Sequence, residues 1–359
     1  MRDRIGLTLV ALVAAVALVL LFEWIAMQRA ANRPGAAVAM QEFEVARGAP
    51  LRSILRSLEQ KQLIGSARHL ELYLRCCQRG TSFTGEGIKA GHYRIAPGQS
   101  PLSILRQLTE GRVVLEQVTI IEGWTFAQMR NELEHHQAIQ TTLSARSDAE
   151  VMQALQNPGL SAEGRFAPDT YSFAPGTTDL QLLRMAFEAQ RHVLEDAWNS
   201  RQPDLPFATM DEALVMASIV EKETGLASER ARVAGVFVNR LRKGMRLQSD
   251  PTVIYGIRDH YDGNIRKSDL TSDTPYNTYT RTGLPPTPIA LPGRDSIVAT
   301  LHPEKTDALF FVATGDGSGG HYFSATVSEH NQAVQRYLER LHRSVPAHDA
   351  ATEPGAVPP

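Results

Sequence analysis

The sequence predicts an α+β protein with one N-terminal transmembrane helix, a small first domain and a larger mixed α/β domain. Three observations support this prediction. An uncharged apolar run from Ile5 to Phe22 is long enough to cross a bilayer. Residues 42–112 then alternate between short strand-like and helix-like patterns. Beyond residue 113 the helical patterns are longer, and most of the polar detail gathers between residues 209 and 341.

We divide the 359 residues into five segments. Residues 1–27 form a cytoplasmic tip and membrane anchor, 28–41 a linker, 42–112 the small domain, 113–343 the large domain and 344–359 a disordered tail. The formal net charge of −2 gives no reason to expect a nucleic-acid partner.

The N-terminal segment predicts a single-pass anchor. Arg2 and Arg4 precede the apolar run, which favours a cytoplasmic N-terminus, although Arg29 and Arg33 follow it and make the bias slight. Trp24 lies where an aromatic side chain would meet the membrane interface. A cleaved signal peptide is the alternative, but its apolar region would be unusually long and no small-x-small cleavage site follows at once. In both cases the rest of the chain is exported.

The sequence pattern of residues 42–112 predicts the order strand, helix, helix, strand, helix. Ser100 can cap the last helix, Pro101 suits its first position and Gly111 follows its end. The only two cysteines, Cys76 and Cys77, are adjacent near the end of the second helix. Because a vicinal disulfide is strained and rare, we expect two unpaired thiols.

A buried helix is predicted between Thr209 and Gly225. Thr209 and Glu212 have the pattern of a capping box, and the helix is apolar over most of its circumference. Two glutamates, Glu221 and Glu223, lie at its end. A carboxyl in apolar surroundings has a raised pKa, which suits a general acid at neutral pH. The alternative is that both reach solvent and are inert, and the helical pattern alone does not choose between them.

Polar and aromatic side chains are dense between residues 246 and 279. Asn, Gln and Asp hydrogen-bond sugar hydroxyls, and Tyr rings pack against sugar faces, so this set beside a buried carboxylate predicts a glycan cleft. Each residue also has a local alternative, as a turn former or as core filling. The predicted lining residues are Gln248, Asp250, Tyr255, Tyr276, Asn277 and Tyr279.

Other chemistries fit this sequence less well. Ser218 and Lys222 are four residues apart, whereas penicillin-binding enzymes need Ser-x-x-Lys and two further motifs. The glycine-rich residues 313–321 lack the Gly-Lys-Ser/Thr of a phosphate loop, and residues 134–137 lack metalloprotease spacing. We expect neither a metal nor a cofactor.

The chain resembles the membrane-anchored endolytic murein transglycosylases (YceG-like). The resemblance covers most of the chain from Glu42 to Leu341. The sequence differs from the family pattern in the Pro-rich loop. Thr287 stands where a Gly is expected, and Leu291 stands where a small polar residue is expected. The matching stretches are ASIVEKET, ERARVAGVFVNRLRKGMRLQSDPTVIYGI, YNTYTRTGLPP and GGHYFS, with weaker matches at KAGHYRI, EGWTF and PDTYSF.

The resemblance implies a helix in the cell inner membrane, a small LysM-like subdomain and a catalytic domain in the periplasm. It implies a lyase that cuts nascent peptidoglycan strands internally, between N-acetylmuramic acid and N-acetylglucosamine, and leaves a 1,6-anhydro end. Such an enzyme would terminate strand elongation beside the cell-wall synthases, which are plausible partners. The catalytic residue that the resemblance implies is Glu221, the first glutamate of EKE.

The implied chemistry needs only one carboxyl. Glu221 and Glu223 point about 200° apart on a helix, so they cannot flank one bond as the two carboxyls of ordinary glycosidases do. If the sugar's own C6 hydroxyl attacks C1, Glu221 can protonate the leaving oxygen and then accept the hydroxyl proton. Its helix side carries Ala217 and Ser218, which are small enough to leave room for a ligand. A peptidoglycan hydrolase and a non-catalytic glycan-binding scaffold remain the alternatives.

Overall fold

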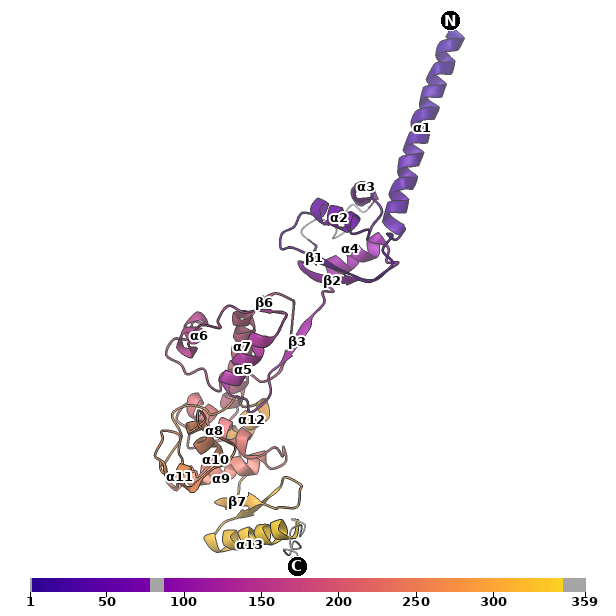
Figure 1. Cartoon of the computed structure of the whole chain (residues 1–359). Coiled ribbons are helices and arrows are strands. Elements are labelled where there is room, and N and C mark those ends of the chain that lie inside the picture. Colours follow the sequence, from indigo (N-terminus) through magenta and orange to yellow (C-terminus); the bar gives the residue numbers. More distant parts are fainter. Residues whose placement is uncertain (1, 78–86, 345–359) are drawn as a thin grey trace, which may run out of the picture. The chain divides into compact units, whose positions relative to one another are not determined.

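The structure is a computed structural model that describes residues 2–77 and 87–344. It divides into two compact units, which are described separately below. Unit 1 consists of Met1–Gln117 with Ser172–Thr177, and unit 2 of Val118–Tyr171 with Thr178–Pro359. Helices and short strands occur in both units, which confirms the predicted mixed class (Figure 1).

The helix α1 (Arg2–Asn32) is long and apolar enough to cross a membrane, as a signal sequence would also be. It extends beyond the predicted anchor end at residue 27 and continues to Asn32, into the segment predicted as a linker (28–41). The reason is packing, because Ala30 and Ala31 are buried in the core of unit 1.

Unit 1 confirms the predicted order strand, helix, helix, strand, helix. Its strands pair antiparallel, with Phe43 opposite Tyr93, and both side chains are buried in the core. Ser100 accepts a hydrogen bond from the Ser103 amide at the start of the last helix, and Gly111 ends that helix with φ of +72°. The elements after α1 are β1 (Gln41–Val45), α2 (Leu51–Gln60), α3 (Ala67–Cys77), β2 (Gly91–Ile95) and α4 (Pro101–Glu110).

The cysteine prediction is confirmed. Cys76 and Cys77 are both free and exposed at the C-terminal end of α3.

Residues 116–178 contain four short strands and two helices, and the division assigns them partly to each unit. β3 (Glu116–Thr119) pairs with β5 (Thr170–Phe173), and a capping box between Thr125 and Gln128 opens the next helix. The remaining elements of this part are α5 (Phe126–His135), β4 (Ile139–Gln140), α6 (Asp148–Ala154) and β6 (Thr177–Thr178).

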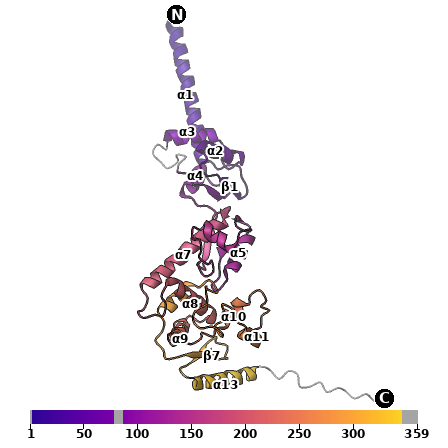
Figure 2. The same cartoon turned by 90° about the vertical axis from the view of Figure 1, so that its left-hand side faces the viewer.

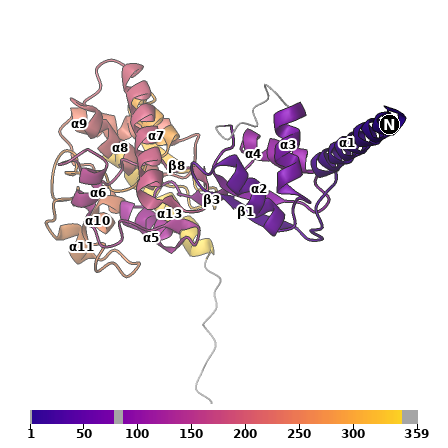
Figure 3. The same cartoon turned by 90° about the horizontal axis from the view of Figure 1, so that it is seen from above.

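The core of unit 2 is built around the helix α8 (Met210–Glu223). Residues 213–220 of this helix are all buried, which confirms the prediction of a largely buried helix. It packs against its neighbours α7 (Asp179–Asn199), α9 (Arg230–Arg242), α10 (Asp250–Gly256) and α12 (Arg294–Leu301) (Figures 1 and 3). The short α11 (Lys267–Thr271) lies in the segment between α10 and α12.

A hairpin and a helix complete unit 2. β7 (Phe310–Ala313) and β8 (His321–Ser324) pair antiparallel, and both contact α13 (Val327–Ser344) (Figure 2). The predicted disordered tail begins at Ser344, which ends α13, and its other residues lie outside the described part of the chain.

Candidate active site

Glu221 lies in the last turn of α8 and is half-buried. Its Oε2 accepts a hydrogen bond of 2.9 Å from the amide of Gly293. Gly293 is the N-cap residue of α12, so the Glu221 carboxylate lies at the positive end of that helix dipole. The Gly293 amide and the N-terminal end of α12 therefore both face this carboxyl.

The segment before Gly293 is fixed to α8 and to the turn at Gly123. The Ser218 hydroxyl donates to the Val215 carbonyl (2.7 Å) and accepts from the Ile289 amide (3.0 Å). The Gly123 amide donates to the Leu291 carbonyl at 2.9 Å. These bonds place Gly293 against Glu221, one turn along α8 from Ser218.

The small side chains beside Glu221 therefore have a different use from the predicted one. Ala217 and Ser218 are completely buried, and they accommodate the Pro-rich loop rather than a ligand. The same contacts exclude a Ser-Lys hydrolase, because the Ser218 hydroxyl is bonded within the core and Lys222 Nζ donates to the Gly123 carbonyl (3.2 Å).

The two departures in the Pro-rich loop both have structural partners. Thr287 Oγ1 hydrogen-bonds the hydroxyl of Tyr276 (2.8 Å). Leu291 is fully buried, and its backbone pairs with Gly123 and Trp124. The Thr287 side chain and the Leu291 backbone therefore both help to hold the Pro-rich loop in position.

Glu122 is a site residue that the sequence reasoning missed. Its carboxyl lies against Gly293, where an added Cβ would come within 2.0 Å of Glu122 Oε1. Burial, and then the negative charge of Glu221, raise the pKa of Glu122, while the charge of Arg230 opposes them. Arg230 also bridges to Asp295, with Nη1 3.3 Å from Oδ2. The only sequence signal was the EGWTF stretch, in which Glu122 is the first residue.

Glu223 lies in different surroundings. Burial raises the pKa of its carboxyl to about 7, partly offset by the Ser249 hydroxyl and the Arg240 guanidinium. The charge of Asp250 acts in the same direction as burial. Arg240 is itself buried and donates to the carbonyls of Leu309 and Leu247. Glu223 therefore lies within electrostatic reach of a structural cation.

Five of the predicted lining residues pair with one another or with a neighbour of Glu223. The Tyr279 hydroxyl donates to Asp250 Oδ1 at 2.5 Å. Gln248, in a left-handed conformation with φ of +51°, accepts at Oε1 from Arg240 (3.4 Å). Tyr255 packs edge-on against Tyr276, with ring centroids 4.8 Å apart.

The hydroxyl of Tyr255 is directed into the protein. It donates to Glu163 Oε2 (3.0 Å), and Glu163 Oε1 accepts from the Phe126 amide (2.8 Å). Glu163 is only 7% exposed, and burial raises its pKa to about 7. Tyr255 can therefore offer a ligand only the exposed part of its ring.

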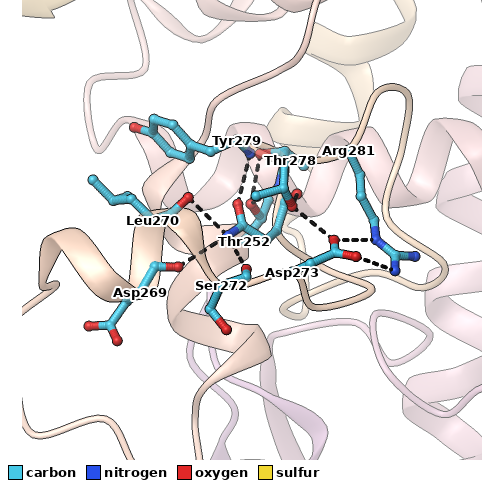
Figure 4. Close-up of polar contacts among 10 residues, drawn as sticks. Thr252, Asp269, Leu270, Ser272, Asp273, Thr278, Tyr279 and Arg281 are labelled. Atoms are coloured by element: carbon cyan, nitrogen blue, oxygen red, sulfur yellow. Dashed lines mark hydrogen bonds and ion pairs between the residues drawn. The ribbon is translucent and has the colours of Figure 1, made fainter.

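Asn277 does not have the predicted binding role. It has no exposed surface, and its side-chain oxygen accepts from the Tyr279 amide (2.8 Å). Its Nδ2 is within hydrogen-bond distance of three carbonyls, and Figure 4 shows these three residues around the loop with Tyr279 nearby. The accepting residues are Asp269, Leu270 and Ser272. A ligand cannot reach this amide, which holds the loop together instead.

Within the described part of the chain, no direct hydrogen bond links Glu221 to the six predicted lining residues. The structure gathers Gln248, Asp250 and Tyr279 near Glu223, and Tyr255 with Tyr276 near Glu163. Glu221 instead contacts Gly293, and Glu122 lies against the same glycine.

Comparisons with known proteins agree on one family. A model of the YceG-like family matches residues 43–336. An endolytic murein transglycosylase of Bacillus subtilis (strain 168) is 32% identical over 308 residues, which cover 81% of this chain and 83% of that protein. An endolytic murein transglycosylase of Streptococcus pneumoniae serotype 2 (strain D39 / NCTC 7466) is 29% identical over 285 residues, 70% of this chain and 51% of that protein.

A solved structure has the same fold. The crystal structure of a yceG-like protein from Listeria monocytogenes aligns with a TM-score of 0.50 at 30% sequence identity. The alignment covers 82% of this chain and 99% of that one.

Proposed function

We propose that this chain, which belongs to the YceG-like family, is an endolytic peptidoglycan lytic transglycosylase with Glu221 as its general acid and base. The observation that carries the assignment of the residue is the hydrogen bond from the Gly293 amide to the Glu221 carboxyl at the end of α8. Family membership and the names of the relatives support the reaction class.

The mechanism uses Glu221 twice. Its carboxyl first donates a proton to the glycosidic oxygen as the bond from that oxygen to C1 breaks. The C6 hydroxyl of the same sugar then forms the new bond to C1, and its proton returns to Glu221. The Gly293 amide stabilises the carboxylate that exists between these two transfers, because a charge-assisted hydrogen bond is stronger than a neutral one. No water is consumed.

The finer parts of this function are also proposals. The bond cut lies between N-acetylmuramic acid and N-acetylglucosamine of nascent strands, the product ends in 1,6-anhydro-N-acetylmuramic acid, and cutting ends strand growth. Unit 2 acts in the periplasm from an anchor in the inner membrane, beside cell-wall synthases. The antiparallel β1–β2 pair with α2 and α3 between them supports a LysM-like role for residues 42–112.

Five of the six predicted lining residues remain candidates for substrate contact. Asn277 is removed because it is completely buried. The others each keep exposed or half-exposed surface, and the Asp250 carboxylate and tyrosine rings suit sugar hydroxyls and sugar faces. These five are Gln248, Asp250, Tyr255, Tyr276 and Tyr279.

One observation favours a hydrolase as the second candidate. A hydrolase needs a second carboxyl as nucleophile or as base for water, and Glu122 lies against the same Gly293 that binds Glu221. Its contact with Arg230 and the neighbouring Asp295 instead suits a role in positioning Gly293 and Glu221.

The test compares Glu221→Gln with Glu223→Gln in the full-length protein acting on purified peptidoglycan. Loss of a general acid costs roughly 10²–10⁴-fold in rate, so Glu221→Gln should release almost no anhydro-muropeptides. Glu223→Gln, which keeps the shape of the side chain and leaves the reacting carboxyl in place, should retain most of the activity. Equal release by the wild type and Glu221→Gln would refute the assignment. Binding of glycan without any product at high enzyme concentration would indicate a scaffold.

A further inference from the structure

A groove lined by arginines lies on the outer face of α2 and α3 in unit 1. Its volume is about 520 Å³. Arg52 and Arg56 are one turn apart on α2, and Arg68 and Arg75 are two turns apart on α3, so the four side chains share this face. The charged lining residues are Arg52, Arg56, Arg68 and Arg75 with Glu59 and Glu71, which gives the groove a formal charge of +2. We call it the arginine groove.

Two of these arginines are held in place by one carboxylate. Glu71 accepts from Arg52 Nε (3.1 Å) and Nη2 (3.2 Å), and from Arg75 Nη2 (2.6 Å). The Arg52 hydrogen bond, together with the charges of both arginines, lowers the pKa of Glu71 despite its burial. Only 15% of the Glu71 side chain is exposed, against 60% for Arg52 and 69% for Arg75. The carboxylate is covered, while the guanidinium groups that bind it remain largely exposed to solvent.

The groove lies beside the helix that could cross a membrane. Glu23, the first charged residue after the apolar run, has its Oε2 3.4 Å from Nε2 of His69 on α3. Ala30 and Ala31 at the end of α1 are buried in the core that α2 and α3 help to form. Figures 1 and 2 show α2 and α3 on the side of unit 1 from which α1 extends, with β1 on the far side. If α1 spans a bilayer, α3 therefore lies at its surface.

We propose that the arginine groove binds the phosphate groups of anionic phospholipids in the bilayer that holds α1. Guanidinium groups bind phosphate oxygens through two parallel hydrogen bonds, and anionic lipids attract basic segments next to a membrane helix. The exposed Leu72 lies one turn from Arg68 on the same helix and can enter the headgroup layer. This contact fixes the orientation of unit 1 on the membrane, and it does not depend on the proposed reaction.

The native cysteines provide the test, because they end α3 next to Arg75 and are the only two in the chain. The full-length protein with Cys77→Ser carries a bimane fluorophore on Cys76 and is inserted into nanodiscs. One set contains phosphatidylcholine and the other an equal mixture with phosphatidylglycerol, each with a trace of lipid bearing a nitroxide on its headgroup. We expect quenching by the nitroxide to be roughly twofold stronger with phosphatidylglycerol, and to fall in high salt.

Two charge-matched variants locate the effect. Arg56→Gln with Arg68→Gln should remove the phosphatidylglycerol dependence, since both side chains line the groove. Arg94→Gln with Arg106→Gln changes the charge of unit 1 equally at exposed positions outside the groove and should preserve it.

Three results would overturn the proposal. Equal quenching in the two bilayers would show that no anionic lipid is bound. Equal losses in the two variants would show attraction by net charge without a site. A change in bimane signal on adding inorganic pyrophosphate to phosphatidylcholine nanodiscs, with no effect of phosphatidylglycerol, would assign the groove to another phosphate source.

Discussion

Glu221 and Glu223 lie two residues apart in the last turn of α8, and their side chains have different surroundings. Glu221 is half-buried and accepts a backbone hydrogen bond at the N-terminal end of α12. Glu223 lies near the buried Arg240, and burial raises its pKa to about 7. One carboxyl thus contacts the loop that ends at Gly293, and the other lies beside buried side chains of the domain core.

The difference shows how one helix can carry both a reacting group and a structural group. Side chains two residues apart point about 200° from each other, so neighbours on opposite sides of α8 decide their roles. On the Glu221 side these neighbours are Gly293 and Glu122. On the Glu223 side they are Ser249 and Arg240. Substitutions on the Glu221 side should alter the rate of glycan cleavage, and substitutions on the Glu223 side should alter the free energy of unfolding.

The largest of these effects is expected at Gly293. Its φ of −70° suits alanine, but a Cβ there would come within 2.0 Å of Glu122 Oε1 and displace one of the two carboxyls. Because small misplacements of catalytic groups are costly, Gly293→Ala should lower the rate by about 10- to 100-fold, measured as anhydro-muropeptide release. Gly65→Ala, which meets no atom within 4 Å, is the control. Adding Glu122→Ala to Gly293→Ala should recover part of the rate, and no recovery would show that the clash is not the cause.

A change in the loop near Glu223 should act on stability. Asn277→Asp removes the buried donors to three carbonyls and adds a charge where there is no exposed surface. Loss of such buried bonds should cost about 3 kcal/mol, seen as a lower midpoint of thermal unfolding. Asn264→Asp at an exposed position should change the midpoint little. If both variants unfold alike, the Asn277 network does not hold the loop.

A smaller effect is expected from pH. Burial raises the pKa of Glu163 and of Glu223 from 4.5 to about 7. Because the folded protein binds these protons more tightly, the stability they add is complete below about pH 4.5 and is lost as the pH rises through about 7.

The free energy of unfolding should therefore fall between about pH 5 and pH 8. Glu163→Gln, which keeps an acceptor for the Phe126 amide, should reduce this fall by roughly 1–2 kcal/mol. The exposed variant Glu134→Gln serves as the control. An unchanged pH dependence in Glu163→Gln would contradict the burial of this charge.

The local features of the fold could be predicted from the sequence because they depend on neighbouring residues. The caps at Ser100 and Thr209 each bond an amide within the next turn, as their patterns indicated. The apolar circumference of α8 correctly predicted its burial. The helical spacing also predicts different surroundings for Glu221 and Glu223.

The rest of the site depends on contacts between distant segments. Glu122 reaches Glu221 only because the Gly123 turn pairs with the backbone of Leu291, and no local pattern signals that pairing. Asn277 was predicted to bind sugar from its chemical type, but burial of the loop decides its role. Amide and hydroxyl groups hydrogen-bond the backbone of a loop as readily as they hydrogen-bond a ligand. The residue types alone therefore could not distinguish these two roles.

The most direct test of the central claim, that Glu221 alone supplies the reacting carboxyl, is the mass of the terminal sugar released by Glu122→Gln beside the wild type. Both should release 1,6-anhydro ends, with the variant slower by at most about tenfold because Glu122 only positions its neighbours. Reducing ends one water heavier from the wild type, lost together with activity in Glu122→Gln, would contradict this account and make the pair Glu221 and Glu122 a hydrolase site.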